Sequence, residues 1–341
     1  MILLGATSAM ALTAPFEPPS GTATAKMLAE CPPPPPPLTS LPTQSRYRQD
    51  DPTKSEVDPE LAKAYDAAVQ PMRDFQGQVV SWANSYFGRP ERKVADAACA
   101  LLWMHAWASK DALVSLPPGE GQFNRDQAFA GLGLAYLQIA AVNVEGLDPG
   151  PTIVAWLREA AEQARVHYET EAGRVSRMNN HRYFAAVAVA VAGIAAEDED
   201  LFDWAMDTLR SAVCMAGDDG SLPLEMERGA RAREYQMFAT GPLVMLAELG
   251  VSNGIATYEE CDNSLPRIVA FTLRSIDDPR PIEEHADERQ QAIGELKGYR
   301  VAWLAPWLKR NPDPKWEQRI DRIGKLRLTS LGGDLSLLFN N

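Results

Sequence analysis

FAAVAVAVAGIAA, residues 184–196, decides the fold, because it is apolar on nearly every side of a helix. A helix of that kind must be buried all round. By contrast, IVAWLREAAEQARVHYE at 153–169 carries charged residues along one face, which is typical of a helix at the surface. Buried and amphipathic helices in alternation predict an all-α fold built from helical hairpins, either a toroid or a solenoid.

The same helical spacing of apolar residues recurs along most of the chain. PPGEG at 117–121, DPGP at 148–151 and GDDGSLP at 217–223 separate the helical segments. No tetratricopeptide or ankyrin repeat is visible, which favours the closed toroid, and we expect few strands or none. The expected helices span 93–114, 125–142, 152–169, 182–196, 199–216, 231–249 and 264–275.

The N-terminal part of the chain has a different composition. Residues 1–14 form a short apolar run with an A-x-A arrangement at 9–11, which resembles an export signal but lacks basic residues; the alternative is a mis-assigned start or a disordered tail. Residues 15–60, with CPPPPPP at 31–37, predict an extended strap and loop. Residues 61–341 are expected to form the helical domain.

Composition restricts the class of partner. Asp and Glu outnumber Lys and Arg by 46 to 33, and the net charge of −13 argues against binding to nucleic acid or to an anionic membrane. No segment after the first approaches the roughly 18 apolar residues of a membrane span. We expect a soluble periplasmic or secreted protein, and a monomer, since no coiled-coil seam is present. A polyanionic ligand would need a local cluster of Arg and Lys.

The cysteines leave two alternatives open. Cys31, Cys99, Cys214 and Cys261 lack the close spacing of a zinc or redox motif, so we expect no metal and no cofactor. In an oxidising compartment at least one disulfide is plausible, and Cys31 is the natural candidate to staple the strap. Four buried free thiols are the alternative.

Two polar clusters interrupt the helical pattern. In RMNNHRYF, residues 177–184, Asn179 or Asn180 can cap a helix that begins near His181, and this arrangement presents backbone N–H groups and an imidazole to an anion. The simpler interpretation is a plain cap followed by a surface histidine.

The second cluster is LEMERGARAREYQMF at 224–238, in which Arg228, Arg231 and Tyr235 would share one face if the segment is helical. Two neighbouring cations favour an anionic ligand and would lower the pKa of Tyr235. The alternative is a solvated basic face whose charge is balanced by Glu225 and Glu227.

Together, the two clusters resemble the mannuronate-specific alginate lyases and their polyuronate-lyase relatives, which share an Asn-Asn-His segment and a downstream Arg…Tyr segment. Further segments resemble that family in the same order, so the resemblance covers most of the chain. These segments are CPPPPPPLTSLPTQSRY at 31–47, ACALLWMHAW at 98–107, LFDWA at 201–205, AWL at 302–304 and LTSLGGDLSLLF at 328–339.

The resemblance implies an incomplete (α/α) toroid with a tunnel-like cleft, and a metal-independent β-elimination of a polyuronate. It implies that Asn180, His181 and Arg228 hold and neutralise the uronate carboxylate, while Tyr235 exchanges protons with the substrate. Arg46 aligns with a lysine of the family that contributes to the cleft. Tyr47, Asn179 and Arg231, neighbours of these residues, are expected to bind substrate as well.

The proton transfers leave one alternative open. A tyrosine is a poor base at neutral pH unless nearby cations lower its pKa, a role that falls to Arg228. Tyr235 could then serve a syn elimination, as in mannuronate, both by taking the C5 proton and by returning a proton to the leaving oxygen. His181 is the alternative base, in an anti elimination that requires two residues.

Three departures from the family pattern affect the choice of polymer. Arg46 stands in place of lysine, Phe184 in place of a frequent tryptophan, and Gln236 in place of a common histidine. Polyglucuronate or a mixed exopolysaccharide is therefore an alternative to poly-mannuronate. Trp103 and Trp107, four residues apart, could stack on sugar rings in the cleft, although such an apolar stripe more often packs between helices.

Two other functions fit part of the pattern. A glycoside hydrolase on a helical toroid would need two carboxylates in the cleft, for which Glu225 and Glu227 are candidates. A non-catalytic polysaccharide-binding or export-scaffold protein would use the same arginines but would not need Tyr235.

Overall fold

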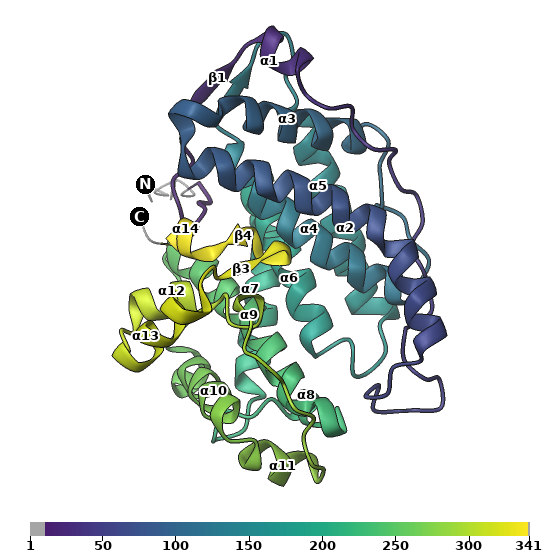
Figure 1. Cartoon of the computed structure of the whole chain (residues 1–341), viewed down its shortest axis with the longest axis vertical. Helices are drawn as coiled ribbons and strands as arrows, with labels where there is room; N and C mark the ends of the chain where they lie inside the picture. The colour runs from purple at the N-terminus through teal and green to yellow at the C-terminus, as the bar shows by residue number, and fades with distance from the viewer. Residues whose placement is uncertain (1–10, 340–341) are drawn as a thin grey trace, which may run out of the picture.

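The computed structural model describes residues 11–339, and nearly all of its regular structure is helical (Figure 1). The predicted export signal therefore lies mostly outside the described residues. None of the helices in this range has the length and apolarity that a membrane crossing requires. The longer helices are α2 (Pro59–Gly88), α3 (Pro90–Ala108), α4 (Glu120–Ile139), α5 (Gly150–Val166), α6 (Asn180–Ala196), α7 (Glu199–Cys214), α9 (Ala232–Ser252), α10 (Glu260–Asp277) and α13 (Pro314–Ile323).

Shorter elements connect and flank these helices. A π-helical turn, His167–Glu171, extends α5. The short helices are α1 (Ala25–Ala29), α8 (Pro223–Met226), α11 (Arg280–Ala286), α12 (Leu304–Arg310) and α14 (Leu335–Phe339), and the short strands of the described range are β1 (Gly21–Ala23), β2 (Val142–Val144), β3 (Arg327–Leu328) and β4 (Gly333–Asp334). β1 pairs with β2 in parallel and β3 with β4 antiparallel, so the prediction of few strands is confirmed.

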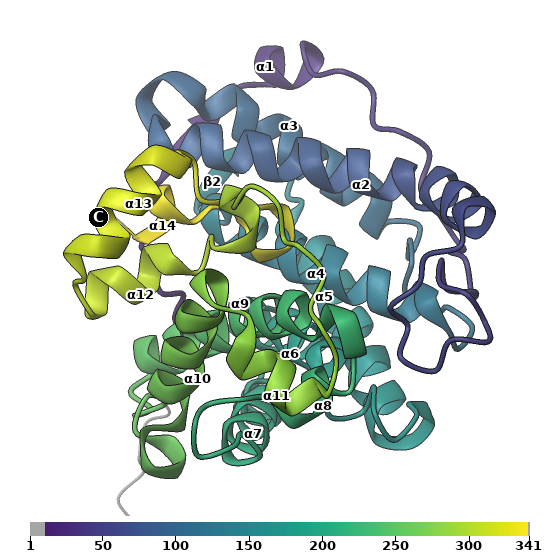
Figure 2. The same cartoon turned by 60° about the horizontal axis from the view of Figure 1, so that its bottom comes forward.

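Hairpins of inner and outer helices make up the body of the molecule (Figure 2). The inner helices α2, α4, α6 and α9 pack against one another in that order, and the outer helices α3, α5, α7 and α10 do the same. Each inner helix is followed in the chain by an outer one. This arrangement is the incomplete (α/α) toroid that the family resemblance implies, with α6 inside and α5 outside as the apolar pattern of the sequence predicts.

The apolar helix α6 lies at the centre of these contacts, packed against α4, α5, α7 and α9. Val187, Val189 and Val191 are fully buried, and each contributes roughly 1.5–3 kcal/mol by leaving water. Close approach of the neighbouring helix requires Gly133 of α4, because a Cβ there would overlap the side chain of Val191. The position of α6, and of its first turn, is therefore fixed from several sides.

Most helix boundaries differ from the expected ones, and the longest helix, α2, is not among the expected helices. The segment expected at 93–114 leaves the helix after Ala108, and Asp111 and Leu113 adopt left-handed backbone conformations. α2 is one continuous 30-residue helix, although Pro71 lies inside it. It starts where the side chain of Asp58 accepts hydrogen bonds from the first-turn amides, two residues before the predicted start of the helical domain.

Trp103 and Trp107, the tryptophans considered above as sugar-stacking residues, hold the proline-rich strap against α3. The indole N–H of Trp103 donates to the carbonyl of Pro32 at 2.8 Å, and that of Trp107 donates to the carbonyl of Pro35 at 3.0 Å. Phe75 of α2 stacks on Trp107 with ring centroids 3.7 Å apart. The structure thus corrects the expectation that Trp103 and Trp107 bind substrate. Their indole N–H groups are hydrogen-bonded to the backbone of the strap, and their rings pack between helices.

All the cysteines are paired. Cys31 is bonded to Cys99 of α3 and Cys214 of α7 to Cys261 of α10. The expectation that Cys31 staples the strap is confirmed, and the alternative of four free thiols is wrong.

Removal of the strap disulfide should destabilise the fold. Cys31 and Cys99 are 68 residues apart. A disulfide that closes a loop of that size is expected to stabilise the folded state by about 4 kcal/mol at most. The double variant Cys31→Ser/Cys99→Ser should therefore lower the free energy of unfolding in urea by about 2–4 kcal/mol. An unchanged urea midpoint would contradict this role.

The indole of Trp107 should matter for stability more than that of Trp103, because Trp107 is fully buried and Trp103 is partly exposed. Trp107→Phe loses the hydrogen bond to Pro35 and leaves a small cavity, so it should cost roughly 1–3 kcal/mol in thermal or urea unfolding. Trp103→Phe is the matched control and should cost less. Equal losses would show that burial of the indole is not what holds the strap.

Candidate active site

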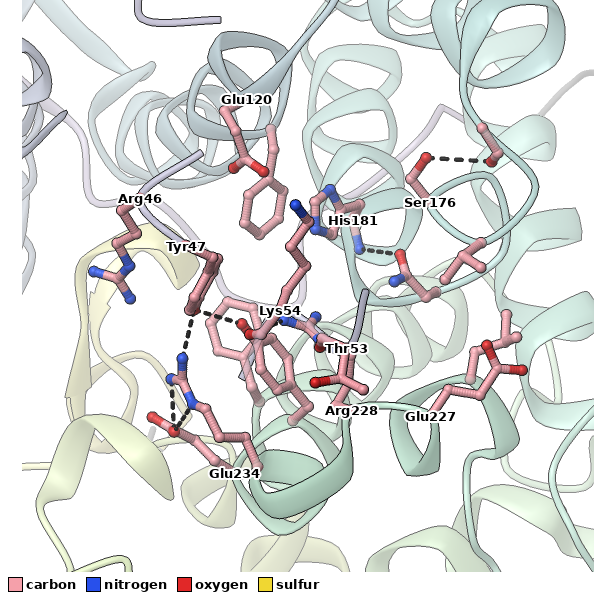
Figure 3. Close-up of a pocket in the computed structure, with 18 of the residues that line it drawn as sticks. Arg46, Tyr47, Thr53, Lys54, Glu120, Ser176, His181, Glu227, Arg228 and Glu234 are labelled. Atoms are coloured by element: carbon pink, nitrogen blue, oxygen red, sulfur yellow. Dashed lines mark hydrogen bonds and ion pairs between the residues drawn. The ribbon is translucent and has the colours of Figure 1, made fainter. Parts of the chain in front are cut away.

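A cleft of about 650 Å³ opens on one side of the toroid (Figure 3). Its walls come from the strap loop, the first turn of α4, the segment before α6, and the segment that joins α8 to α9. Six of its lining residues are basic and three are acidic, in a chain whose net charge is −13. The basic residues are Arg46, Lys54, Arg73, Arg174, Arg228 and Arg231, and the acidic ones are Glu120, Glu227 and Glu234.

The first turn of α6 brings His181 to the cleft. Asn179 is the N-cap, and its side chain accepts a hydrogen bond from the backbone N–H of His181 at 3.1 Å. The imidazole stacks on Phe123 of α4, with ring centroids 3.9 Å apart. Burial, and secondarily the charge of Arg228, lower the pKa of His181 to about 3. The ring is therefore neutral at physiological pH, and burial makes it a weaker base than a free imidazole.

Tyr235, on the first turn of α9, is the centre of the second cluster. Its hydroxyl oxygen lies 2.8 Å from that of Tyr47 in the strap loop. The guanidinium carbon of Arg228 lies 3.4 Å from the centroid of the Tyr235 ring, and that of Arg231 lies 5.2 Å away. The two arginines do meet Tyr235 as the sequence predicts, although Arg228 precedes α9 and is not part of a regular helix.

Arg231 connects this cluster to the strap and to a carboxylate. It donates to the Tyr47 hydroxyl at 2.6 Å and, through Nε and Nη2, to Glu234 at 2.9 and 2.7 Å. Arg300 lies 3.7 Å from the other oxygen of Glu234. Glu234, rather than Glu225 or Glu227, is thus the residue that balances the charge of Arg231.

The ionisation of the tyrosine pair differs from the sequence-based expectation. Burial raises the pKa of Tyr235, and this effect outweighs the opposing charges of Arg228 and Arg231. Burial also acts against ionisation of Tyr47, but its hydrogen bond with Tyr235 and the cations Arg231 and Arg46 lower its pKa overall. In the free protein Tyr235 is therefore a protonated phenol, and Tyr47 is the more acidic member of the pair.

The strap loop is held in shape by Asp51, whose carboxylate accepts hydrogen bonds from the backbone amides of Thr53, Ser55 and Glu56 at 2.6–2.9 Å. Because of that fold, the carbonyl oxygens of Thr53 and Lys54 face Arg228. Its Nε donates to Thr53 at 2.9 Å and its Nη2 to Lys54 at 3.1 Å. These bonds leave Nη1 of Arg228 for another acceptor in the cleft.

Most of the residues predicted for the site come together. The cleft is lined by Arg46, Tyr47, Asn179, His181, Arg228, Arg231 and Tyr235. Asn180 is not among the lining residues: it is fully buried behind the wall, and its backbone N–H and side-chain Nδ2 donate to Glu225 at 2.9 and 2.8 Å. The expectation that Asn180 reaches the substrate carboxylate directly is therefore corrected by its placement.

Sequence reasoning missed several residues of the cleft. Phe123, Lys54 and Glu120 line it, but each belongs to a segment whose local pattern is that of an ordinary helix start or loop. Their place in the site becomes apparent only in the tertiary structure, where they line the same cleft as the two polar clusters around His181 and Tyr235. The two carboxylates proposed for a glycoside hydrolase are also separated, because Glu225 is buried on Asn180 while Glu227 lines the cleft.

The arrangement suits proton transfer beside an anion. The cleft offers cations for a carboxylate, a neutral imidazole, and a phenol pair that can share protons. Within residues 11–339 no group of three or more His, Cys, Asp or Glu side chains is placed to hold a metal ion.

This chain is similar to known alginate lyases. Residues 133–282 match the family model described as alginate lyase. An alginate lyase of Azotobacter vinelandii is 28% identical over 318 residues, which cover 91% of this chain and 84% of the relative. An alginate lyase of Pseudomonas fluorescens is 28% identical over 346 residues, which cover 96% of this chain and 90% of the relative.

Solved structures share the fold. Alginate lyase A1-III of Sphingomonas species A1 superposes with a TM-score of 0.77 at 24% identity, covering 92% of this chain and 86% of that one. A variant of alginate lyase A1-III in complex with a tetrasaccharide superposes with a TM-score of 0.75, covering 89% of this chain and 84% of that one. The matching family model and the relatives along nearly the whole chain make this chain similar to the alginate lyases, and the solved structures show that it shares their helical toroid.

Proposed function

We propose that this chain is a polysaccharide lyase that cleaves a 1,4-linked polyuronate, alginate or a related acidic polymer, by β-elimination. The observation that carries the proposal is the meeting of Tyr235, Tyr47, Arg228 and Arg231 in a cationic cleft, opposite the neutral imidazole of His181. Relatives and structural neighbours named alginate lyase support it.

The reaction breaks the C5–H and C4–O bonds of a uronate. A base takes the C5 proton, the electron pair forms the C4–C5 double bond, and the O4 of the leaving sugar takes a proton. The obstacle is the negative charge that develops on the C5 carboxylate, which preorganised cations and N–H donors stabilise. Arg228, whose Nη1 has no hydrogen-bond partner among residues 11–339, and Arg46 at the cleft wall are the groups that this cleft offers for that purpose.

Tyr235 is the proton-transfer residue of this proposal. Since burial raises its pKa, it holds a proton in the free protein and can act as the acid toward the leaving oxygen. To act as the base it must first lose that proton, and the charges of Arg228 and Arg231 assist this loss, whereas burial and the hydrogen bond with Tyr47 oppose it. His181 is the alternative base, for an anti elimination: its ring is neutral, but burial lowers its pKa and so weakens it as a base in the free protein.

The polymer and the compartment are proposals of the same kind. Poly-mannuronate is the first expectation, and polyglucuronate or a mixed exopolysaccharide is the alternative, because Arg46, Phe184 and Gln236 depart from the usual family pattern. We infer a periplasmic or secreted protein, which the two disulfides support.

Tyr235→Phe should separate cleavage from binding. Removal of one acid–base group is expected to lower kcat about 10²- to 10⁴-fold, while polymer binding stays near that of the wild type. Cleavage is followed by absorbance of the unsaturated uronate on poly-mannuronate, poly-guluronate and polyglucuronate, and binding by calorimetry with poly-mannuronate. If the wild type binds these polymers and cleaves none, the lyase proposal is wrong and a polysaccharide-binding scaffold replaces it.

Lys54→Met should weaken the binding of a polyanionic substrate in a salt-dependent way, since Lys54 lines the cleft. We expect KM to rise roughly 3- to 10-fold at about 50 mM NaCl, and this difference to shrink at about 500 mM, where charges are screened. Lys93→Met is the matched control, because Lys93 lies on α3 in a surface pair with Asp96. Equal effects of the two variants would mean that net charge, rather than the cleft, attracts the polymer.

A further inference from the structure

Glu225 of α8 is a fully buried carboxylate that does not line the cleft. A buried charge is costly unless it is hydrogen-bonded. Arg228 is three residues away in the chain, but its bonds go to the carbonyl oxygens of Thr53 and Lys54. The hydrogen bonds that stabilise the ionised form of Glu225 must therefore come from elsewhere.

They come from the first residue of α6. Oε1 of Glu225 accepts from the backbone N–H of Asn180 at 2.9 Å, and Oε2 accepts from Nδ2 of the same residue at 2.8 Å. The carboxylate thus sits at the positive end of the α6 dipole, where an anion is favoured. Contact at two points fixes both the start of the helix and the orientation of the Asn180 amide.

The orientation of this amide has a cost. Oδ1 of Asn180 is buried and has no hydrogen-bond partner among the described residues. An unsatisfied buried acceptor of this kind costs about 1–3 kcal/mol. An ionised carboxylate can only accept hydrogen bonds, so it forces the NH₂ group of Asn180 toward itself and Oδ1 away. Glu225 therefore imposes an orientation that Asn180 would not adopt by itself.

We propose that Glu225 is a positioning residue for the elimination: its ionised carboxylate holds Asn180 and the first turn of α6, so that His181 and its cap Asn179 face the substrate. This inference rests on the proposed function of the cleft. His181 follows Asn180 directly, and its own backbone N–H is held by Asn179 at 3.1 Å. Loss of the Glu225 contact would loosen the turn from which the imidazole projects.

The surroundings of Glu225 place its titration near neutral pH. Burial raises its pKa to about 7, while the hydrogen bonds from Asn180 and the charge of Arg228 oppose the rise and Glu227 adds to it. Tyr183 of α6 also faces it and stays protonated, because burial raises the pKa of that phenol. On the other elements packed against α8, Gln236 of α9 binds Leu222, next to α8, and Ile282 of α11 packs with Met226.

Protonation of Glu225 should give the pH profile of the activity a distinct acid limb. Above about pH 7 Glu225 is ionised and holds Asn180, whereas below that pH it gains a proton and one of its two acceptor positions becomes a donor. Activity should therefore fall as the pH drops through about 7. His181 does not account for such a limb, because its pKa is about 3.

Kinetics of Glu225→Gln, Asn180→Ala and the double variant test the proposal. Activity is measured on poly-mannuronate from roughly pH 5 to pH 9. Glu225→Gln should lower kcat by up to about 10²-fold, as expected for displaced catalytic groups, with little change in KM. The fall of activity below about pH 7 should disappear in this variant. The double variant should be no worse than Asn180→Ala alone, because both residues act through one contact.

The matched control is Glu248→Gln. Glu248 is also buried, accepts hydrogen bonds from Tyr258 at 2.6 Å and Arg310 at 3.1 Å, and lies thirteen residues beyond Tyr235 on α9, about 20 Å along the helix. It should lose stability but keep the wild-type kcat and acid limb. A folded Glu225→Gln protein that keeps both as well would overturn the proposal.

A second readout does not depend on cleavage. The chain has 4 histidines, so the Cε1–Hε1 NMR signal of His181 can be assigned by substitution. The signal should move in Glu225→Gln and Asn180→Ala but not in Glu248→Gln. If Glu225→Gln does not fold, Asn180→Ala must move the signal and lower kcat, or the proposal fails. If the wild type cleaves no polyuronate, the proposed function is wrong, and an unmoved His181 signal would then refute the positioning role separately.

Discussion

The burial of α6 is the constraint on which the rest of the site depends. A helix that is apolar all round cannot turn toward water, so its contacts with α4, α5, α7 and α9 fix its position and its rotation. Its N-terminus is consequently held at the edge of the core, where Asn179 and Asn180 satisfy the first turn and His181 projects into the cleft. The catalytic geometry is thus anchored in a helix that is packed on all sides by other helices.

The strap completes the site from the opposite end of the sequence. The disulfide of Cys31 and the indoles of Trp103 and Trp107 hold the strap on α3, and the loop that follows brings Tyr47 to Tyr235. The same loop turns backbone carbonyls toward Arg228. Elements that look like mere packing therefore determine where a phenol and a guanidinium lie in the cleft.

Charge and burial act against each other in this cleft. The cations near Tyr235 favour its phenolate, but burial prevails and keeps the phenol protonated. Tyr47, whose hydroxyl accepts a hydrogen bond from Arg231 and whose ring lies beside Arg46, is the more acidic partner. Burial also keeps His181 neutral. A polyanion that enters the cleft brings its negative charge next to a protonated Tyr235 and a neutral His181. The excess of cations along the cleft attracts it locally, even though the whole chain carries a charge of −13.

The sequence by itself determined that the helix at 184–196 is buried and that the helix at 153–169 has a surface face, and it identified the two polar clusters around His181 and Tyr235, because helical periodicity and capping are local properties. It did not determine that Asn180 turns toward Glu225, that Glu234 rather than Glu225 pairs with Arg231, or that the two tryptophans hold the strap. Tyr47 and Tyr235 are 188 residues apart, and their contact exists only because the strap and α9 are packed onto the same toroid. The sign of the pKa shift of Tyr235 was likewise decided by tertiary structure, since the cations are visible in the sequence but the burial that outweighs them is not.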